Sequence, residues 1–303
     1  MINKVLITGG AGFIGSHLAE ALIRKGYDII IVDDMSRGRS ENLKNIINKI
    51  EFIRGNILNF ELMEELVKRS DIIFHLAALS RVMPSIENPE LCFKSNIEGT
   101  EIMARICARS GRKLIFSSSR EVYGTAKYIP VDEHHPLNPE NPYGTSKIAG
   151  EKIIESYSKC YDLKYSILRL ANIYGDRDFD RVIPIFIKNC LNNNDLIVYG
   201  GEQIIDFIYI SDVIEAFLKI LETNENIILN VGSGKGTTLI DLAQNIFRIS
   251  EKKGKIITKE KRKAEVECFI ADIGKAQKIL NWNPEVSLEN GLEKLFFKSR
   301  LSI

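Results

Sequence analysis

Apolar residues in the first half of the chain alternate between short β-branched runs and longer stretches with helical spacing. The short runs predict strands at Val5–Thr8, Ile29–Val32, Phe52–Arg54, Ile72–Leu76, Leu114–Ser117 and Tyr165–Leu170. The intervening stretches predict amphipathic helices at Gly15–Lys25, Leu62–Arg69, Ile97–Ala108 and Tyr143–Cys160. This βαβ order predicts an α/β fold, a doubly wound parallel sheet with helices on both faces.

The pattern becomes less regular after about Tyr174 and then resumes. We expect a helix near Asp212–Leu221, a strand near Ile227–Val231, and helices near Leu239–Ile249 and Ala271–Leu280. We therefore divide the chain into a first domain at 1–175 and a smaller C-terminal lobe at 176–303, with 205–235 returning to the first domain.

Composition excludes several classes of protein. The 303 residues carry 41 basic and 40 acidic side chains, which gives no net field to attract nucleic acid or an anionic membrane. Five cysteines without a CxxC pair argue against a disulfide framework and against a zinc site, so we expect no metal. No apolar run approaches the ~20 residues of a membrane helix. A cytoplasmic protein is the simplest expectation.

A glycine-rich turn follows the first predicted strand. Gly9, Gly12 and Gly15 have GxxGxxG spacing and lead into a helix, the arrangement of a Rossmann dinucleotide site. The first glycine makes the turn, the second admits the pyrophosphate, and the third lets the helix approach the sheet. Asp33, at the end of the next strand, suits ribose hydroxyls and repels a 2′-phosphate, so NAD is favoured, although Arg37 keeps NADP open.

These motifs resemble the extended short-chain dehydrogenases, and the resemblance covers nearly the whole chain. Gly55-Asn56-Ile57 stands where the family has a Gly-Asp-Ile/Leu turn that contacts adenine, and Asn56 keeps a hydrogen-bonding side chain but loses the charge. His75-Leu76-Ala77-Ala78 matches the segment along the cofactor, and Asn96 matches the asparagine before the fourth helix. The resemblance implies an NAD site formed by Gly9, Gly12, Phe13, Ile14, Gly15, Asp33, Asn56, Ile57, Leu76, Ala77, Ala78, Asn96, Ser117, Tyr143 and Lys147.

The candidate acid–base pair is Tyr143-x-x-x-Lys147. Asn141 and Pro142 before it are residues that begin helices, so both side chains should lie on one face of a helix, one turn apart. A tyrosine hydroxyl has a reference pKa of about 10, and a nearby ammonium together with the helix dipole favours its phenolate. The resemblance adds Ser119, four residues before the tyrosine of Val-Tyr-Gly, as the third catalytic residue.

Arg120 and Glu121 stand where related 4,6-dehydratases carry Asp-Glu. Arginine cannot deliver a proton, so dehydration is disfavoured. Glu121 is compatible with the related UDP-glucuronate decarboxylases, and a surface ion pair between the two residues is an equal alternative.

The resemblance also implies that the domain at 1–175 binds NAD and that 176–303 is mainly a substrate-binding lobe with a nucleotide-sugar site. The candidate residues of that site are Arg81, Ser119, Arg120, Glu121, Tyr143, Asn172, Arg181, Val198, Tyr199, Arg262, Glu265 and Phe269. Ile205 replaces an arginine that contacts phosphates in most relatives. Phe269 should crowd a 2-acetamido group, which favours glucose, galactose or uronic acid substrates.

We therefore expect an NAD-dependent isomerase resembling the UDP-hexose 4-epimerases, which oxidises the sugar transiently to a 4-keto intermediate. UDP-glucose and UDP-galactose are the expected substrates. UDP-glucuronate 4-epimerisation or decarboxylation is an alternative, and a catalytically silent NAD-binding regulator is an alternative of another class. The resemblance also implies a homodimer.

Overall fold

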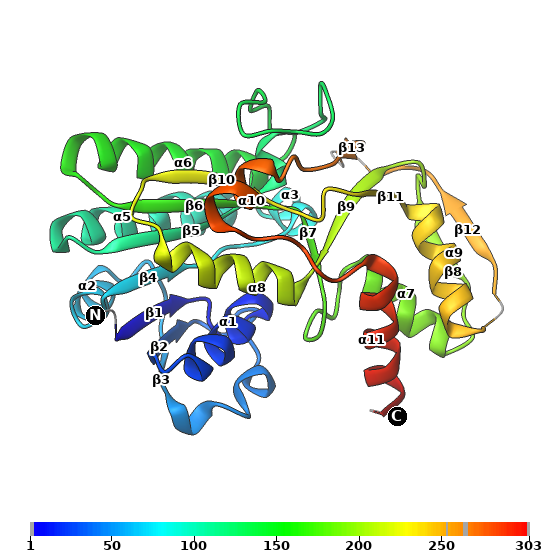
Figure 1. Ribbon diagram of the computed structural model, residues 1–303, viewed down its shortest axis with the longest axis horizontal. Coiled ribbons are helices and arrows are strands. Elements are labelled where there is room, and N and C mark those ends of the chain that lie inside the picture. Colours follow the sequence, from blue (N-terminus) through cyan, green and yellow to red (C-terminus); the bar gives the residue numbers. More distant parts are fainter. Residues whose placement is uncertain (1–2, 253, 263–265, 302–303) are drawn as a thin grey trace. The chain divides into compact units, whose positions relative to one another are not determined.

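The computed structural model describes residues 3–252, 254–262 and 266–301 (Figure 1). It contains a seven-stranded sheet with the order β10-β6-β5-β4-β1-β2-β3. The pairs β1–β2, β2–β3, β1–β4 and β4–β5 are parallel. Its strands are β1 (Lys4–Thr8), β2 (Asp28–Asp33), β3 (Ile50–Arg54), β4 (Ile72–His75), β5 (Lys113–Ser119), β6 (Tyr165–Leu170) and β10 (Ile227–Val231).

The chain divides into two compact units. The first unit comprises the residues up to Gly124, Pro136–Arg169 and Ile214–Leu229. The second unit comprises Thr125–His135, Leu170–Val213 and the residues from Asn230 onward. The helices that begin in the first unit are α1 (Phe13–Arg24), α2 (Phe60–Lys68), α3 (Val82–Glu87), α4 (Pro89–Phe93), α5 (Gly99–Ser110) and α6 (Pro142–Tyr161).

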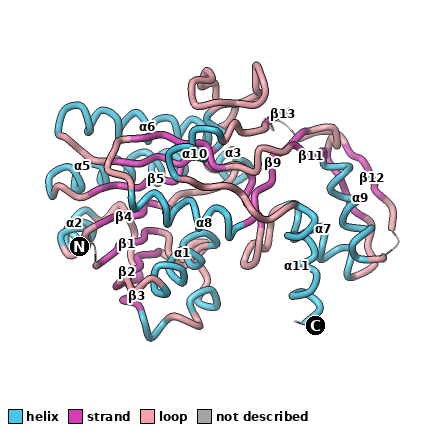
Figure 2. The backbone as a smooth tube through the Cα atoms, in the orientation of Figure 1, coloured by secondary structure: helices cyan, strands magenta, loops and turns pink. Residues whose placement is uncertain are grey.

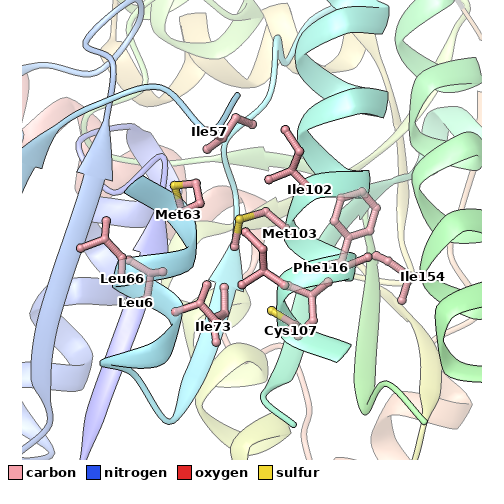
Figure 3. Packing of buried hydrophobic residues seen from close by; sticks show 14 of the residues in the cluster. Leu6, Ile57, Met63, Leu66, Ile73, Ile102, Met103, Cys107, Phe116 and Ile154 are labelled. Atoms are coloured by element: carbon pink, nitrogen blue, oxygen red, sulfur yellow. The ribbon is translucent and has the colours of Figure 1, made fainter. Parts of the chain in front are cut away.

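The core of the first unit lies between its sheet and the helices α2, α5 and α6. Figure 3 shows Leu6, Ile73 and Phe116 from the strands facing Met103 of α5 and Ile154 of α6, and all five are at most 1% exposed. Burial of one such aliphatic or aromatic side chain stabilises the fold by about 1.5–3 kcal/mol. The helices α5 and α6 lie side by side (Figure 1), and α6 also packs against β5.

The second unit has two small sheets, which Figure 2 shows with its helices. One sheet contains β7 (Asn172–Tyr174), β9 (Ile204–Tyr209), β11 (Gly236–Thr238) and β13 (Cys268–Phe269), and the other pairs β8 (Leu196–Tyr199) with β12 (Ile256–Lys259). Its helices are α7 (Val182–Leu191), α9 (Leu239–Ser250), α10 (Gly274–Leu280) and α11 (Leu288–Leu301). The helix α8 (Ile210–Lys219) begins in the second unit and ends in the first.

The predicted α/β fold with a Rossmann-type sheet is confirmed, with element ends displaced by a few residues. The last predicted helix begins at Gly274, because Ala271 instead forms a bridge with Val131. The strands β7, β8, β11, β12 and β13 of the second unit were not predicted, since two to four residues are too few to display a periodicity. The six-residue strand β9 was also missed. Within the described residues, no helix is long and apolar enough to span a membrane.

Candidate active site

The glycine-rich turn has the shape that a dinucleotide phosphate requires. Gly9 adopts φ +70°, and a Cβ there would lie 2.8 Å from the amide nitrogen of Ala77. At Gly15 a Cβ would lie 2.4 Å from the carbonyl oxygen of Gly9, so α1 approaches the turn closely. At Gly12 an added Cβ would meet only the Gly9 oxygen, at 3.2 Å. Gly12 is also the N-cap of α1 and provides no side-chain acceptor, so the first amides of the helix remain for a phosphate.

Asp33 ends β2 beside this turn. Its carboxylate accepts the Ala11 amide and the Met35 amide, both at 2.9 Å, and it is 7% exposed. Burial raises the pKa of Asp33, and the two backbone hydrogen bonds oppose that shift. Each carboxylate oxygen keeps a lone pair for a ribose hydroxyl. Asn56 lies near the same edge and donates to Asp34 at 3.2 Å. These residues fit NAD.

The remaining cofactor candidates surround the same strand ends. Phe13 and Ile14 form the first turn of α1, Ser117 lies in β5, and the buried Ile57 follows β3. Leu76, Ala77 and Ala78 follow β4, where Ala77 donates its amide to Thr8. Arg81, a substrate candidate, is the N-cap residue of α3.

The helix α6 begins as the sequence predicts. The side chain of Asn141 caps it by accepting the Gly144 amide at 2.9 Å, and Pro142 occupies its first turn. Tyr143 is half-buried, and its amide donates to the Ser85 hydroxyl at 3.2 Å. The cap by Asn141 and the hydrogen bond to Ser85 therefore fix the helix N-terminus that carries Tyr143. Ser85 is a supporting residue that no sequence motif indicated.

Lys147 lies one turn further along and is 3% exposed. Its ammonium donates to the Ser117 carbonyl at 2.8 Å and lies 4.7 Å from the Phe116 ring centroid and 5.8 Å from that of Tyr143. Burial lowers the pKa of Lys147 to about 8. A buried cation this close to a tyrosine ring favours the phenolate form of that tyrosine.

Ser119 ends β5 and is 8% exposed. Its hydroxyl accepts the Glu121 amide at 3.2 Å, which fixes the turn after the strand. Arg120 and Glu121 form the ion pair that the sequence left open, with 2.9 Å between nitrogen and oxygen. The expected surface location is wrong, because the pair is buried, with 11% and 7% of the two side chains exposed. The second oxygen of Glu121 accepts a hydrogen bond from the side-chain Nδ2 of Asn141 at 2.8 Å, so this carboxylate also holds the cap of the catalytic helix.

Asn96 and His75 are buried polar residues of the same unit. Asn96 lies in a π-helical turn, Lys94–Glu98, where its side chain pairs with the backbone of Leu79 and donates to Ser146 at 2.9 Å. Such turns occur often at functional sites. His75 is buried between the hydroxyls of Thr8 and Thr100, and burial lowers its pKa to about 3. It is therefore neutral at physiological pH.

The other substrate candidates belong to the second unit. Asn172 begins β7, and Arg181 is the N-cap residue of α7 and lies 3.8 Å from Asp178. Val198 is buried in β8, and the guanidinium of Arg262 lies 4.1 Å from the ring centroid of Tyr199. Phe269 is 1% exposed and pairs in register with Ile205. Glu265 lies outside the described residues. Among the residues that are described, no group of His, Cys, Asp and Glu could hold a metal ion.

Fold and nucleotide loop together define an NAD-dependent enzyme of the Rossmann type. Residues 5–232 match the model of the NAD dependent epimerase/dehydratase family, and the chain belongs to this family. It is 40% identical over 96% of both chains to a Methanocaldococcus jannaschii protein named "Putative UDP-glucose 4-epimerase". It is 34% identical over 97% of both chains to a UDP-N-acetyl-alpha-D-glucosaminuronate decarboxylase of Bacillus cytotoxicus. The Thermotoga maritima UDP-glucose 4-epimerase, solved with UDP-glucose, superposes with a TM-score of 0.94 at 36% identity, covering 98% of this chain and 99% of that one.

Proposed function

We propose that this protein inverts C4 of a UDP-hexose and interconverts UDP-glucose and UDP-galactose. One observation carries the proposal: Lys147 is buried one turn from Tyr143 on a capped helix, and it is bonded to the strand that ends in Ser119. This is an arrangement for removing and returning a hydroxyl proton. The similarity to two UDP-glucose 4-epimerases supports the choice of substrate.

In the proposed mechanism, Tyr143 takes the proton of the sugar 4-hydroxyl while Ser119 positions that hydroxyl. Lys147 stabilises the tyrosine phenolate and binds the cofactor ribose. The turn at Gly9–Gly15 and the carboxylate of Asp33 hold the cofactor. Bound NAD supplies the chemistry of removing and returning hydride at C4. Tyr143 then returns its proton once the 4-keto sugar has presented its other face.

The first unit is proposed to bind NAD and the second unit the nucleotide of the substrate. Arg262 and Tyr199 support the second assignment, because a guanidinium suits phosphate oxygens and an aromatic ring suits a base. Phe269 and Ile205 are apolar neighbours on adjacent strands, which supports a sugar without a 2-acetamido group. Inversion of C4 by rotation of the 4-keto sugar requires that the nucleotide is bound firmly and the sugar loosely.

The Arg120–Glu121 pair supports epimerisation over dehydration and decarboxylation. Both oxygens of Glu121 already accept hydrogen bonds, from Arg120 and from Asn141. A carboxylate held in this way is suited to positioning the helix rather than to delivering a proton.

Decarboxylation of UDP-glucuronate is the second candidate, because Glu121 is present and a relative at 34% identity is a sugar-acid decarboxylase. Release of ¹³CO₂ from UDP-[6-¹³C]glucuronate would support it. Absence of ¹³CO₂ while a C4 epimer accumulates would eliminate it.

Replacing Tyr143 with Phe tests the proposed base. We expect Tyr143→Phe to lose turnover of UDP-galactose by about 10²-fold or more while still binding NAD in calorimetry. Tyr157→Phe, at the other end of α6 where the hydroxyl donates to Glu101, is the matched control and should keep its activity. Equal rates for Tyr143→Phe and wild type would show that Tyr143 is not the base. If the wild-type protein binds NAD but is inactive on every UDP-sugar, the alternative of a catalytically silent NAD-binding regulator is favoured.

We also propose a homodimer formed through α5 and α6. The side chains available to such an interface include exposed Tyr161 of α6 and exposed Leu91 and Phe93 of α4, which contacts α6. Light scattering coupled to size exclusion distinguishes a dimer from a 34.3 kDa monomer.

A further inference from the structure

A carboxylate with no exposed surface lies one helical turn beyond Lys147. Glu151 of α6 is 0% exposed and pairs with Arg169 of β6 through two hydrogen bonds. The Arg169 Nε donates to one carboxylate oxygen at 3.0 Å, and Nη2 donates to the other at 2.6 Å. A buried pair of this kind needs further hydrogen bonds to offset its desolvation.

The further partners come from the strand end that carries the catalytic serine. The Ser118 hydroxyl donates to Glu151 at 2.5 Å, and Arg169 Nη1 donates to the Tyr123 hydroxyl at 2.9 Å. The guanidinium also lies 5.0 Å from the ring centroid of Tyr123. This buried network therefore joins α6, β6, the end of β5 and the turn that follows it.

The network adjoins the proposed catalytic groups on two sides. Ser118 immediately precedes Ser119 in β5. Glu151 follows Lys147 by four residues, so both side chains lie on one face of α6. A displacement of Glu151 would therefore move both the serine-bearing strand end and the lysine-bearing turn.

We propose that Glu151, held as a carboxylate by Arg169, is a positioning residue that fixes Ser118 beside the catalytic serine and supplies the negative charge that keeps the buried Lys147 protonated. This inference rests on the proposed function for its kinetic consequence. Its electrostatic part concerns Lys147 alone and is independent of any substrate.

Other titratable groups face Lys147 from α6, α4 and β4, and the positive charge of Arg169 from β6 is bonded to Glu151. Tyr143 precedes it on α6, Cys92 faces it from α4, and His75 faces it from β4. Burial raises the pKa of the Cys92 thiol, and burial followed by the charge of Lys147 lowers the pKa of His75 to about 3. Burial lowers the pKa of Lys147 to about 8, and negative charge on Cys92 and then on Glu151 opposes this shift. Because burial raises the pKa of the Cys92 thiol above its usual value, that thiol is uncharged near pH 7, and Glu151 is the group that carries the negative charge there.

The test replaces the pair with neutral residues of similar size. The double variant Glu151→Gln/Arg169→Met leaves no unpaired buried charge, so it is expected to fold even where Glu151→Gln alone does not. The control is Glu155→Gln, which breaks the ion pair with Lys152 on the exposed side of the same helix.

The pKa of Lys147 is read from the full-length protein labelled with ¹³Cε-lysine, and its signal is identified by its loss in Lys147→Met. We expect the pKa to fall by about one unit or more in Glu151→Gln and to stay unchanged in Glu155→Gln. In the double variant we expect a smaller fall, because loss of the positive charge of Arg169 opposes loss of the nearer negative charge of Glu151. The alkaline limb of the kcat profile should shift to lower pH by the same amount, because activity requires the ammonium.

An unchanged Lys147 pKa in a folded double variant would overturn the inference. So would a shifted pKa with an unchanged alkaline limb, since Lys147 would then not limit turnover. A shifted pKa in a protein whose wild type turns over no nucleotide sugar would refute the proposed function and leave the electrostatic inference standing.

Discussion

Replacing Lys147 with Met should stabilise the protein while abolishing its chemistry. Burial lowers the pKa of Lys147 from 10.5 to about 8, which corresponds to about 3 kcal/mol of unfavourable free energy for the charged form. The substitution also removes the hydrogen bond to the Ser117 carbonyl, a loss of about 1 kcal/mol. Near pH 7 we therefore expect Lys147→Met to exceed wild type by about 2 kcal/mol in free energy of unfolding.

The dependence on pH distinguishes this explanation from better packing by methionine. Below about pH 8 the lysine is protonated in both the folded and the unfolded protein, so the whole penalty is present. As pH rises from about 8 toward 10.5, the folded protein loses its proton first, and the penalty disappears. Urea denaturation of nucleotide-free protein from about pH 6.5 to about pH 10 measures the difference. A variant no more stable than wild type at pH 7, or an advantage that does not shrink with pH, would refute the reasoning.

Two further substitutions test the supports of the site. Asn141→Ala removes the cap of α6 and leaves an oxygen of buried Glu121 unpaired, so urea denaturation should show a loss of roughly 2–4 kcal/mol. Asn141→Ser keeps a capping oxygen and should recover about 1 kcal/mol of it; equal losses would show that the cap contributes nothing. Gly15→Ala places a Cβ 2.4 Å from the Gly9 oxygen, and calorimetry should show NAD binding weakened by about tenfold or more. Gly274→Ala, remote from the turn in the sequence, should bind NAD normally; unchanged NAD affinity in Gly15→Ala would contradict the close packing inferred for the turn.

The parts of the fold and site that are local in sequence could be predicted. Strands β1 and β2 are continuous apolar runs, and the cap at Asn141 and Pro142 lies next to the helix that it begins. The positions of Gly9 and Gly15 follow from fixed spacing after a strand, and their contacts with backbone atoms explain why no larger residue fits. These strands, the helix cap and the glycine turn depend on residues that are neighbours in the sequence, so they can be predicted without a structure.

The parts that depend on long-range packing could not. Ser118, Glu151 and Arg169 are far apart in sequence, and none of them has a pattern that indicates a buried charge. The ion pair of Arg120 with Glu121 was one of two open alternatives, because two adjacent charged residues do not reveal their burial. The short strands of the second unit gain their regularity from pairing partners rather than from their own sequence.

Incubation of the purified protein with UDP-galactose, UDP-glucose, UDP-glucuronate and their N-acetyl counterparts, without added cofactor, tests the central proposal most directly. Products identified by NMR should include the C4 epimer of UDP-glucose or UDP-galactose, with no net release of NADH. Carbon dioxide from UDP-glucuronate, or no conversion of any of these sugars, would contradict it.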